Sequence, residues 1–230
     1  MSAALRTVAL CHRYRLGDGE EVVALDEVEL EVPAGTSAAV VGPSGSGKST
    51  LLTILAGLQR PTSGQAFIGD LELTALDEVA LLAVRGQQLA VVAQNPYRNL
   101  LPYATGIENL RFAARGARAR GRTGIPDPRE LLDRLGLGAV ADSRTDRMSG
   151  GERQRLALGA GLASNPEVLL ADEPTSQLDE ANRDVIASLL ARIRHDFGVT
   201  VLVVTHDPAV AAGLDRRFAM NAGRLMEVRS

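Results

Sequence analysis

The sequence predicts an α/β fold in which helices cover a parallel β-sheet, and three observations support this. A glycine-rich loop joins a short apolar run, residues 36–41, to a stretch with helical apolar spacing, residues 48–58. Two further apolar runs, 168–171 and 200–204, each end in polar residues, as buried parallel strands do when their carboxyl ends carry a site. Strand-like and helix-like segments also alternate along the chain, which is typical of such a sheet.

Length and composition bound the class of protein. The chain has 230 residues, 45% of them hydrophobic and 23% charged, so it can bury the core of one large domain and is not disordered, collagen-like or coiled-coil. A net charge of −3 argues against nucleic-acid binding over the whole surface. The apolar runs are too short to span a bilayer, and the single cysteine, Cys11, excludes a disulfide framework. Without a signal-peptide pattern, the cytoplasm is the expected compartment.

The elements follow in order along the chain. Residues 22–32 alternate apolar with acidic side chains, which predicts a half-exposed strand, and residues 33–35 then turn the chain. The strand at 36–41 and the helix at 48–58 come next. Near the end of the chain, the apolar positions of residues 178–193 fall on one helical face, and Gly198 is expected to end that helix.

The middle third has a different pattern. Residues 96–165 read mostly as helix, which predicts a helical lobe inserted between strands, with a loose linker near residues 120–128. The breaks in this pattern are glycines and prolines, namely Gly116, Gly121, Gly124, Pro126 and Pro128.

A run of arginines passes through the same region. Its members are Arg111, Arg115, Arg118, Arg120 and Arg122. We expect such a run to form a solvent-exposed protein surface. The alternatives are that it contacts anionic lipid headgroups or nucleic acid.

The glycine-rich loop carries the first chemical motif. Its sequence fits the phosphate-binding pattern G-x-x-x-x-G-K-[ST] and reads Gly42-Pro43-Ser44-Gly45-Ser46-Gly47-Lys48-Ser49. Glycines let backbone N–H groups converge on phosphate oxygens, while Lys48 reaches the β and γ phosphates and Ser49 can ligate Mg²⁺. Lys48 is also the only lysine among 25 lysine and arginine residues. A flexible linker, the alternative, leaves the lysine and the flanking strand and helix unexplained.

Two carboxylates follow the apolar run at 168–171. Asp172 can hold the shell of a magnesium ion, and Glu173 can polarise an attacking water. An exposed acidic turn is the alternative, but an upstream phosphate loop makes it a poor one.

Ser149 and Glu152 have the spacing of a capping box, in which each side chain satisfies a backbone N–H at a helix start. A helix start with two glycines is also an anion site, so the structural and the functional interpretation are compatible.

With its neighbours, Met148-Ser149-Gly150-Gly151-Glu152 resembles the signature motif of ATP-binding cassette (ABC) ATPases, and it precedes the acidic pair at that family's spacing. The resemblance runs along the whole chain. It implies a P-loop NTPase with a RecA-like α/β core, an N-terminal antiparallel β-subdomain and an inserted α-helical subdomain. Residues 1–230 are then one domain, with the catalytic core and β-subdomain in 1–95 and 166–230 and the helical subdomain, carrying the signature motif, in 96–165.

The resemblance also implies roles for single residues. Tyr14 corresponds to the aromatic residue that stacks on adenine, and the loop at 176–179 to one that contacts a second copy. The implied catalytic residues are Glu173, His206, Gln94 and Lys48. Those implied to bind nucleotide are Tyr14, Gly42, Pro43, Ser44, Gly45, Ser46, Gly47, Lys48, Ser49, Thr50, Ser149, Gly150, Gly151, Glu152 and Asp179. Ser49, Gln94 and Asp172 are implied to hold the metal.

Three of these positions have plainer interpretations outside the family. Tyr14 could be a surface tyrosine, Gln94 a polar residue at a strand end, and His206 a structural histidine in a turn.

The function implied by the resemblance is an ATP- and Mg²⁺-dependent subunit that energises a membrane transporter. Residues 99–109 and 170–175 look most like the branch that releases lipoproteins or exports macrolides and peptides. The implied partners are a polytopic permease and a second copy of the chain or a paralogous ATPase, with no direct nucleic acid. The chain would sit on the inner face of the cell membrane through the permease. The alternatives are a soluble cassette ATPase acting on DNA or ribosomes, or a cell-division ATPase without a transported substrate.

Overall fold

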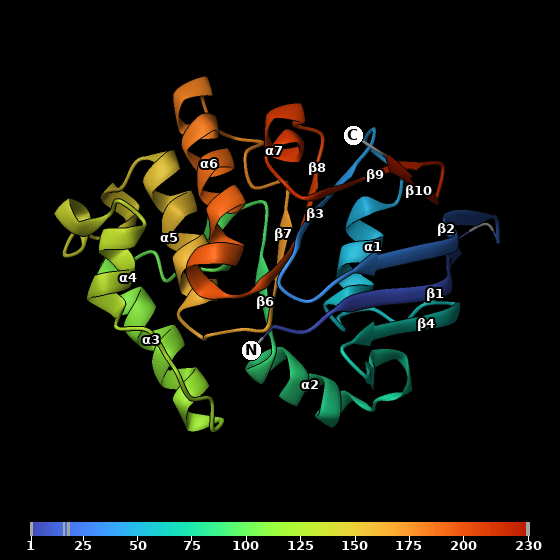
Figure 1. Cartoon of the computed structure of the whole chain (residues 1–230), viewed down its shortest axis with the longest axis horizontal. Helices are drawn as coiled ribbons and strands as arrows, with labels where there is room; N and C mark the ends of the chain where they lie inside the picture. Colours follow the sequence, from blue (N-terminus) through green and yellow to red (C-terminus); the bar gives the residue numbers. More distant parts are fainter. Residues whose placement is uncertain (1, 16, 18, 229–230) are drawn as a thin grey trace.

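A six-stranded sheet crosses the middle of the molecule in the computed structural model, which describes residues 2–15, 17 and 19–228 (Figure 1). Its strand order is β10-β9-β3-β8-β7-β6. The five strands from β9 through β6 are parallel to their neighbours, and β10 pairs antiparallel with β9. The bounds are β3 Ser37–Val41, β6 Leu89–Val92, β7 Val168–Asp172, β8 Thr200–Thr205, β9 Arg216–Asn221 and β10 Arg224–Val228. The strands predicted from the three apolar runs are therefore confirmed as β3, β7 and β8.

A second sheet, of four strands, is antiparallel and has the order β2-β1-β4-β5. Its bounds are β1 Leu5–Arg15, β2 Glu21–Val32, β4 Ser63–Ile68 and β5 Leu71–Glu72. The predicted strand at 22–32 is confirmed as β2, whose buried and exposed residues alternate. The alternation pattern did not predict β1. At Ala9, where φ is 43°, the pairing of β1 with both neighbours shifts register, and the inward-facing positions change parity between Thr7 and Leu10.

The parallel sheet separates two hydrophobic cores, each covered by helices. The first helix, α1 (Lys48–Leu55), contacts strands of both sheets, and its Leu51 and Leu55 lie in the core between them. The second core lies on the other face of the parallel sheet, beneath α3, α5 and α6. The remaining α-helices are α2 Glu78–Gln87, α3 Gly106–Ala119, α4 Pro128–Arg134, α5 Gly150–Leu162, α6 Glu180–Phe197 and α7 Pro208–Ala212.

The central strands are apolar on both faces because they serve both cores. In β7, Val168 and Leu170 face the core that contains α1, whereas Leu169 and Ala171 face the core under the helices. Because these four residues are all buried, on alternate faces, the strand reads as a continuous apolar run, and β8, buried throughout, does the same.

The segment 96–165 is helical, as expected. Besides α3, α4 and α5 it contains the short 3₁₀ turns Pro96–Arg98, Gly138–Val140 and Thr145–Arg147. Gly116 was predicted to break a helix, which is wrong, because it lies inside α3. The prediction for Gly198 is confirmed, since this residue has φ 61° and ends α6.

The linker predicted near 120–128 is present between α3 and α4, but the prediction that it is loose is wrong. Arg122 donates from Nε to the carbonyl oxygen of Asn165 at 2.7 Å and pairs with Glu167 at 3.0 Å. Asn165 in turn donates to the carbonyl of Thr123 at 2.9 Å. The segment is therefore bound to the start of β7 through interactions between residues some forty positions apart, which the local composition does not encode.

The arginines of the run do not share one exposed surface on the linker. Arg111, Arg115 and Arg118 are exposed on α3, whereas Arg122 is largely covered by its partners. Among the described residues, no helix combines the length and apolarity needed to cross a bilayer.

Candidate functional site

The loop between β3 and α1 is shaped by its glycines. At Gly42 a Cβ atom would lie 2.1 Å from the carbonyl oxygen of Met220. At Gly47, where φ is 106°, it would lie 2.2 Å from the carbonyl oxygen of Ala24. Neither position has room for a side chain, so the tight loop that precedes α1 requires glycine at both.

Lys48 begins α1 and folds back over this loop. Its Nζ donates to the carbonyl oxygens of Gly42 at 2.8 Å and Pro43 at 2.9 Å, and the residue is only 6% exposed. The ammonium group is thus held within the loop. Ser46, which is also buried, has no hydrogen-bond partner for its hydroxyl, so the loop retains an unused polar group of its own.

The carboxyl end of β7 provides two acids beside this loop. The hydroxyl of Ser49 donates to Oδ1 of Asp172 at 3.4 Å. Burial, and then the neighbouring charge of Glu173, raise the pKa of Asp172. Glu173 adopts φ 44°, and its backbone N–H donates to the carbonyl of Val204 in the adjacent strand. The chain therefore turns sharply just where this side chain is presented.

His206 and Gln94 follow the ends of β8 and β6, the two strands on either side of β7. Nδ1 of His206 lies 2.8 Å from Oε2 of Glu173, and the His206 backbone N–H donates to the same oxygen at 3.2 Å. Gln94 donates through Nε2 to the hydroxyl of Ser176 at 3.1 Å. Adjacent carboxyl ends of a parallel sheet bring together residues far apart in sequence.

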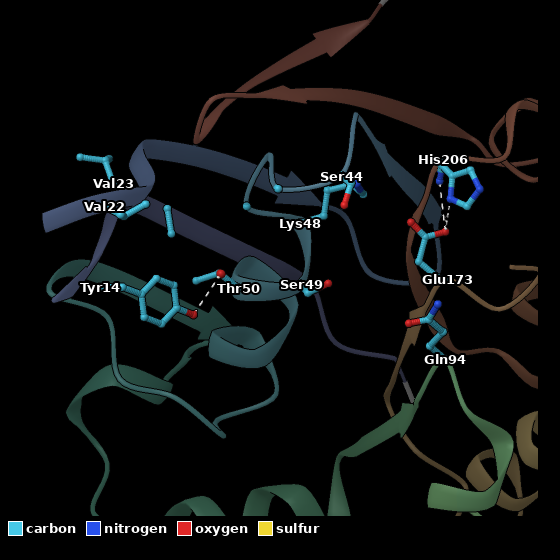
Figure 2. Close-up of a pocket in the computed structure, with 13 residues that line it drawn as sticks. Tyr14, Val22, Val23, Ser44, Lys48, Ser49, Thr50, Gln94, Glu173 and His206 are labelled. Atoms are coloured by element: carbon cyan, nitrogen blue, oxygen red, sulfur yellow. Dashed lines mark hydrogen bonds and ion pairs between the residues drawn. The ribbon is translucent and has the colours of Figure 1, made fainter. Parts of the chain in front are cut away.

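Lys48, Ser49, Gln94, Glu173 and His206 line one cavity of about 690 Å³. Figure 2 shows Tyr14 at one end of it and Glu173, His206 and Gln94 at the other, with Lys48 and Ser49 between them. The predicted residues that line it are Tyr14, Ser44, Gly45, Gly47, Lys48, Ser49, Thr50, Gln94, Glu173 and His206. Gly42, Pro43, Ser46 and Asp172 do not line it, although they bond or adjoin residues that do.

Three lining residues were not predicted. Val22, Val23 and Ala24 enter the cavity from β2, beside Tyr14. Their alternation predicted a strand but gave no sign of a cavity, because the proximity of β2 to the loop is a tertiary relationship.

The motif from Ser149 to Glu152 lies away from this cavity, at the start of α5. Both hydrogen bonds of the predicted capping box are present: Ser149 N–H donates to Glu152 at 2.7 Å, and Glu152 N–H donates to the Ser149 hydroxyl at 3.2 Å. The backbone bond from Ser149 is the main cause of a lowered pKa at Glu152. Gly150 and Gly151 follow in the first turn.

Asp179 caps the next helix of the same region, α6, by accepting from the N–H of Asn182 at 2.9 Å. Asn182 is also the side chain that a Cβ on Gly151 would strike, at 1.9 Å. Five of the predicted nucleotide-binding residues therefore lie around α5 and α6, away from the phosphate loop of the same chain. They are Ser149, Gly150, Gly151, Glu152 and Asp179.

Ser49 and Asp172 are suited to holding a hard cation beside the cavity. Within the described part of the chain, no three His, Cys, Asp or Glu side chains are grouped as metal ligands. A magnesium ion needs only one or two carboxylates when phosphate oxygens and water complete its shell. The neighbouring oxygens of Ser49 and Asp172 fit this requirement.

The phosphate loop, the acid pair and the capping motif at the start of α5 all lie in a stretch of sequence that matches a known family model. The model described as "ABC transporter" covers residues 25–176, more than half of the chain. The chain belongs to the ABC transporter family. The expected fold class is confirmed with it, because solved ABC cassettes share the architecture of both sheets and the inserted helices.

Individual relatives within the ABC transporter family match over nearly the whole chain. The lipoprotein-releasing system ATP-binding protein LolD of Anaeromyxobacter dehalogenans is 41% identical over 203 residues, 88% of this chain and 84% of LolD. The macrolide export ATP-binding/permease protein MacB of Rhodospirillum rubrum is 42% identical over 223 residues, 96% of this chain and 34% of MacB.

Among solved structures, a dimeric post-hydrolysis state of the ATP-binding cassette MJ0796 with ADP and Pi has a TM-score of 0.83. It is 31% identical in sequence and is matched over 98% of this chain and 99% of that one. This ABC family member is therefore an ATP-binding protein and an ATPase.

Proposed function

We propose that this ATPase drives a membrane transporter that releases lipoproteins or exports macrolides or peptides. The similarity to LolD and to the ATP-binding part of MacB supports the branch. In this proposal a polytopic permease carries the substrate, and the chain is held through it on the inner face of the cell membrane. The division into a core, 1–95 and 166–230, and a helical subdomain, 96–165, is part of the same proposal.

The nucleotide lies along the cavity in this proposal. Tyr14 stacks on adenine at one end, and the loop from Gly42 to Thr50 surrounds the phosphates with backbone N–H groups. Lys48 exchanges its carbonyl partners for phosphate oxygens, which its flexible stem and three donors allow.

We further propose that Ser49, Asp172 and Gln94 hold Mg²⁺. When bound, the ion supplies positive charge that offsets the charge developing on the phosphates. The close pairing of Ser49 with Asp172, and the opening of Gln94 into the same cavity, support this set.

Hydrolysis depends on Glu173, and its position is the observation that carries the proposal. Its carboxylate opens into the cavity that contains Lys48, where it can accept a proton from a water that attacks the γ-phosphate. His206 contributes its ring at the same end, bonded to Glu173, and can also hold the γ-phosphate.

A second copy, or a paralogous ATPase, completes the site. Ser149, Gly150, Gly151 and Glu152 lie at a helix N-terminus that is suited to an anion but is remote from the chain's own phosphate loop. Asp179, in the loop before α6, would lie at the same contact. The dimeric arrangement reported for MJ0796 supports this.

Glu173→Gln tests the proposal, because the amide keeps the shape of the carboxylate but cannot act as a base. We expect the variant to bind ATP, to lose turnover by at least about a hundredfold, and to accumulate as an ATP-bound dimer on a sizing column. Glu180→Gln, at an exposed acid at the start of α6, is the matched control and should behave as the unsubstituted chain.

The same variant can be used to identify the partner. In mild detergent with MgATP, Glu173→Gln should copurify with a polytopic membrane protein in about equal amount, as measured by mass spectrometry. Recovery of ribosomes, DNA or a bare homodimer would overturn the transport role, and unchanged turnover would overturn the role of Glu173.

A further inference from the structure

The cavity end that contains Tyr14 is apolar and open. Tyr14 is 40% exposed, and Val22 and Val23 beside it are 44% and 45% exposed, although β1 and β2 are paired here. Figure 2 shows the tyrosine ring lying at this end with its hydroxyl directed toward Thr50. A large aromatic ring left open in this way offers a flat face to a ligand.

Two side chains hold the hydroxyl of Tyr14. Thr50 Oγ1 lies 3.2 Å from it, and Thr50 follows directly on the last residue of the phosphate loop. On its other side is Gln59, whose Nε2 donates to the Tyr14 oxygen at 3.1 Å and whose Oε1 lies 3.2 Å from the same atom. The ring is thus tied at its far end to α1 and to the turn that follows α1.

Gln59 is itself held from two further sides. Its Nε2 lies 2.6 Å from Nε2 of His12, and its Oε1 accepts from the hydroxyl of Thr53 at 3.3 Å. His12 is 8% exposed, and this burial lowers its pKa, which favours the neutral ring; with the proton on Nδ1, Nε2 accepts from the amide. The His12 and Tyr14 rings also pack in a T-shaped arrangement, with centroids 4.6 Å apart and planes at 81°.

Such a network has a consequence for binding. A free tyrosine at a surface samples several rotamers, and ordering it on a ligand opposes association. Here the hydroxyl is already held by hydrogen bonds and the ring is restrained by His12, while 40% of Tyr14 stays exposed, so stacking on a base requires little further ordering.

We propose that Gln59, supported by His12, is a positioning residue that fixes the ring of Tyr14 for stacking on the base of the nucleotide. The proposal rests on the proposed role of Tyr14 and adds the residues that make the ring effective. Neither Gln59 nor His12 lines the cavity, so both act through Tyr14.

The test separates recognition of the base from recognition of the phosphates. Gln59→Leu keeps the size of the side chain but removes both hydrogen-bonding groups. Affinity is measured by competition with a fluorescent ATP analogue, once with MgATP and once with magnesium tripolyphosphate, which has no base. We expect MgATP to bind about three- to tenfold more weakly, with KM raised and kcat unchanged, and tripolyphosphate to bind as before.

Tyr14→Phe provides the second arm, because it keeps the ring and removes only the hydroxyl that Gln59 holds. It should weaken MgATP binding by a similar factor, and the double variant with Gln59→Leu should be no weaker than either single one. Gln65→Leu, at an exposed glutamine of β4 that pairs with Glu72, is the matched control and should change nothing.

Equal weakening of tripolyphosphate and MgATP in Gln59→Leu would overturn the proposal, because the effect would then come from the phosphate loop or the fold. Unchanged MgATP binding would overturn it as well. Failure of the role assigned to Tyr14 is distinguishable, since Tyr14→Ala would then bind MgATP as tightly as the unsubstituted chain.

Discussion

One carboxylate oxygen of Glu173 makes two hydrogen bonds with His206, one from the backbone N–H at 3.2 Å and one with the ring Nδ1 at 2.8 Å. The side chain of Glu173 is largely covered, whereas that of His206 is 65% exposed. The histidine therefore fixes the orientation of the carboxylate from the open side of the cavity. Its second ring nitrogen remains available for a phosphate oxygen.

We expect His206→Ala to lower kcat for ATP hydrolysis by about 10²-fold, because both the orienting ring bond and the proposed phosphate contact are lost. KM should change far less, since the loop around Lys48 is untouched. Steady-state kinetics with His195→Ala, at an exposed histidine near the end of α6, as the control would check this. A kcat equal to that of the control would contradict the assigned role.

Two glycines of the phosphate loop should respond differently to alanine. Gly45 has φ 77°, but a methyl group at this position would have nothing within 4 Å of it, so Gly45→Ala should cost only backbone strain, about 1–2 kcal/mol. Gly47→Ala adds a clash at 2.2 Å with a backbone carbonyl and should abolish ATP binding. Urea unfolding together with ATP titration would distinguish them, and equal effects would show that the clash is relieved.

The glycines of the helical segment form a second contrast. In α3, a methyl group on Gly116 would meet only the flexible end of the Arg120 side chain, at 3.2 Å, so Gly116→Ala should raise the free energy of unfolding by up to about 1 kcal/mol. In α5, a methyl on Gly159 would lie 2.5 Å from Leu135 Cδ1. Gly159→Ala should therefore lower stability by about 1–3 kcal/mol despite better helix propensity. Denaturant titration measures both, and two shifts of the same sign would be inconsistent with this packing.

The capping box of α5 should make stability depend on pH. The backbone bond from Ser149 lowers the pKa of Glu152 in the folded state, relative to about 4.3 when unfolded. The stabilisation is then present above the unfolded value and is lost as the pH falls through the lowered one. Glu152→Gln should be less stable than the unsubstituted chain at pH 7, by less than about 1 kcal/mol because solvent screens the charge, and the difference should close in acid. A difference that stays constant from pH 7 down to unfolding would argue against an ionised cap.

The sequence predicts best those parts of the molecule whose structure depends on residues close together in the chain. The phosphate loop, the acids after β7 and the capping box each depend on residues a few positions apart, and the structure has them as expected. The continuous apolar runs of β7 and β8 are equally local, because a strand covered on both faces needs no polar side.

The parts that were missed depend on distant partners. A bulge at Ala9 interrupts the alternation of β1, and only its pairing with β2 and β4 defines that strand. The segment around Arg122 contains glycine and proline but is fixed by Asn165 and Glu167. Gln59 gives no signal in its own neighbourhood, because its role follows from meeting Tyr14 and His12 across the fold.

The position of Lys48 has a consequence for chemical modification. Apart from Lys48, the lysine and arginine residues of the chain are all arginines. Common acylating reagents do not attack their guanidinium groups. The one side-chain amine is buried against two carbonyls in the loop proposed to bind the nucleotide. Slow acylation of that amine, followed by peptide mass, would therefore report occupancy of a single site, and MgATP should slow it further. The protein's own composition makes it a probe of nucleotide binding that requires no engineered label.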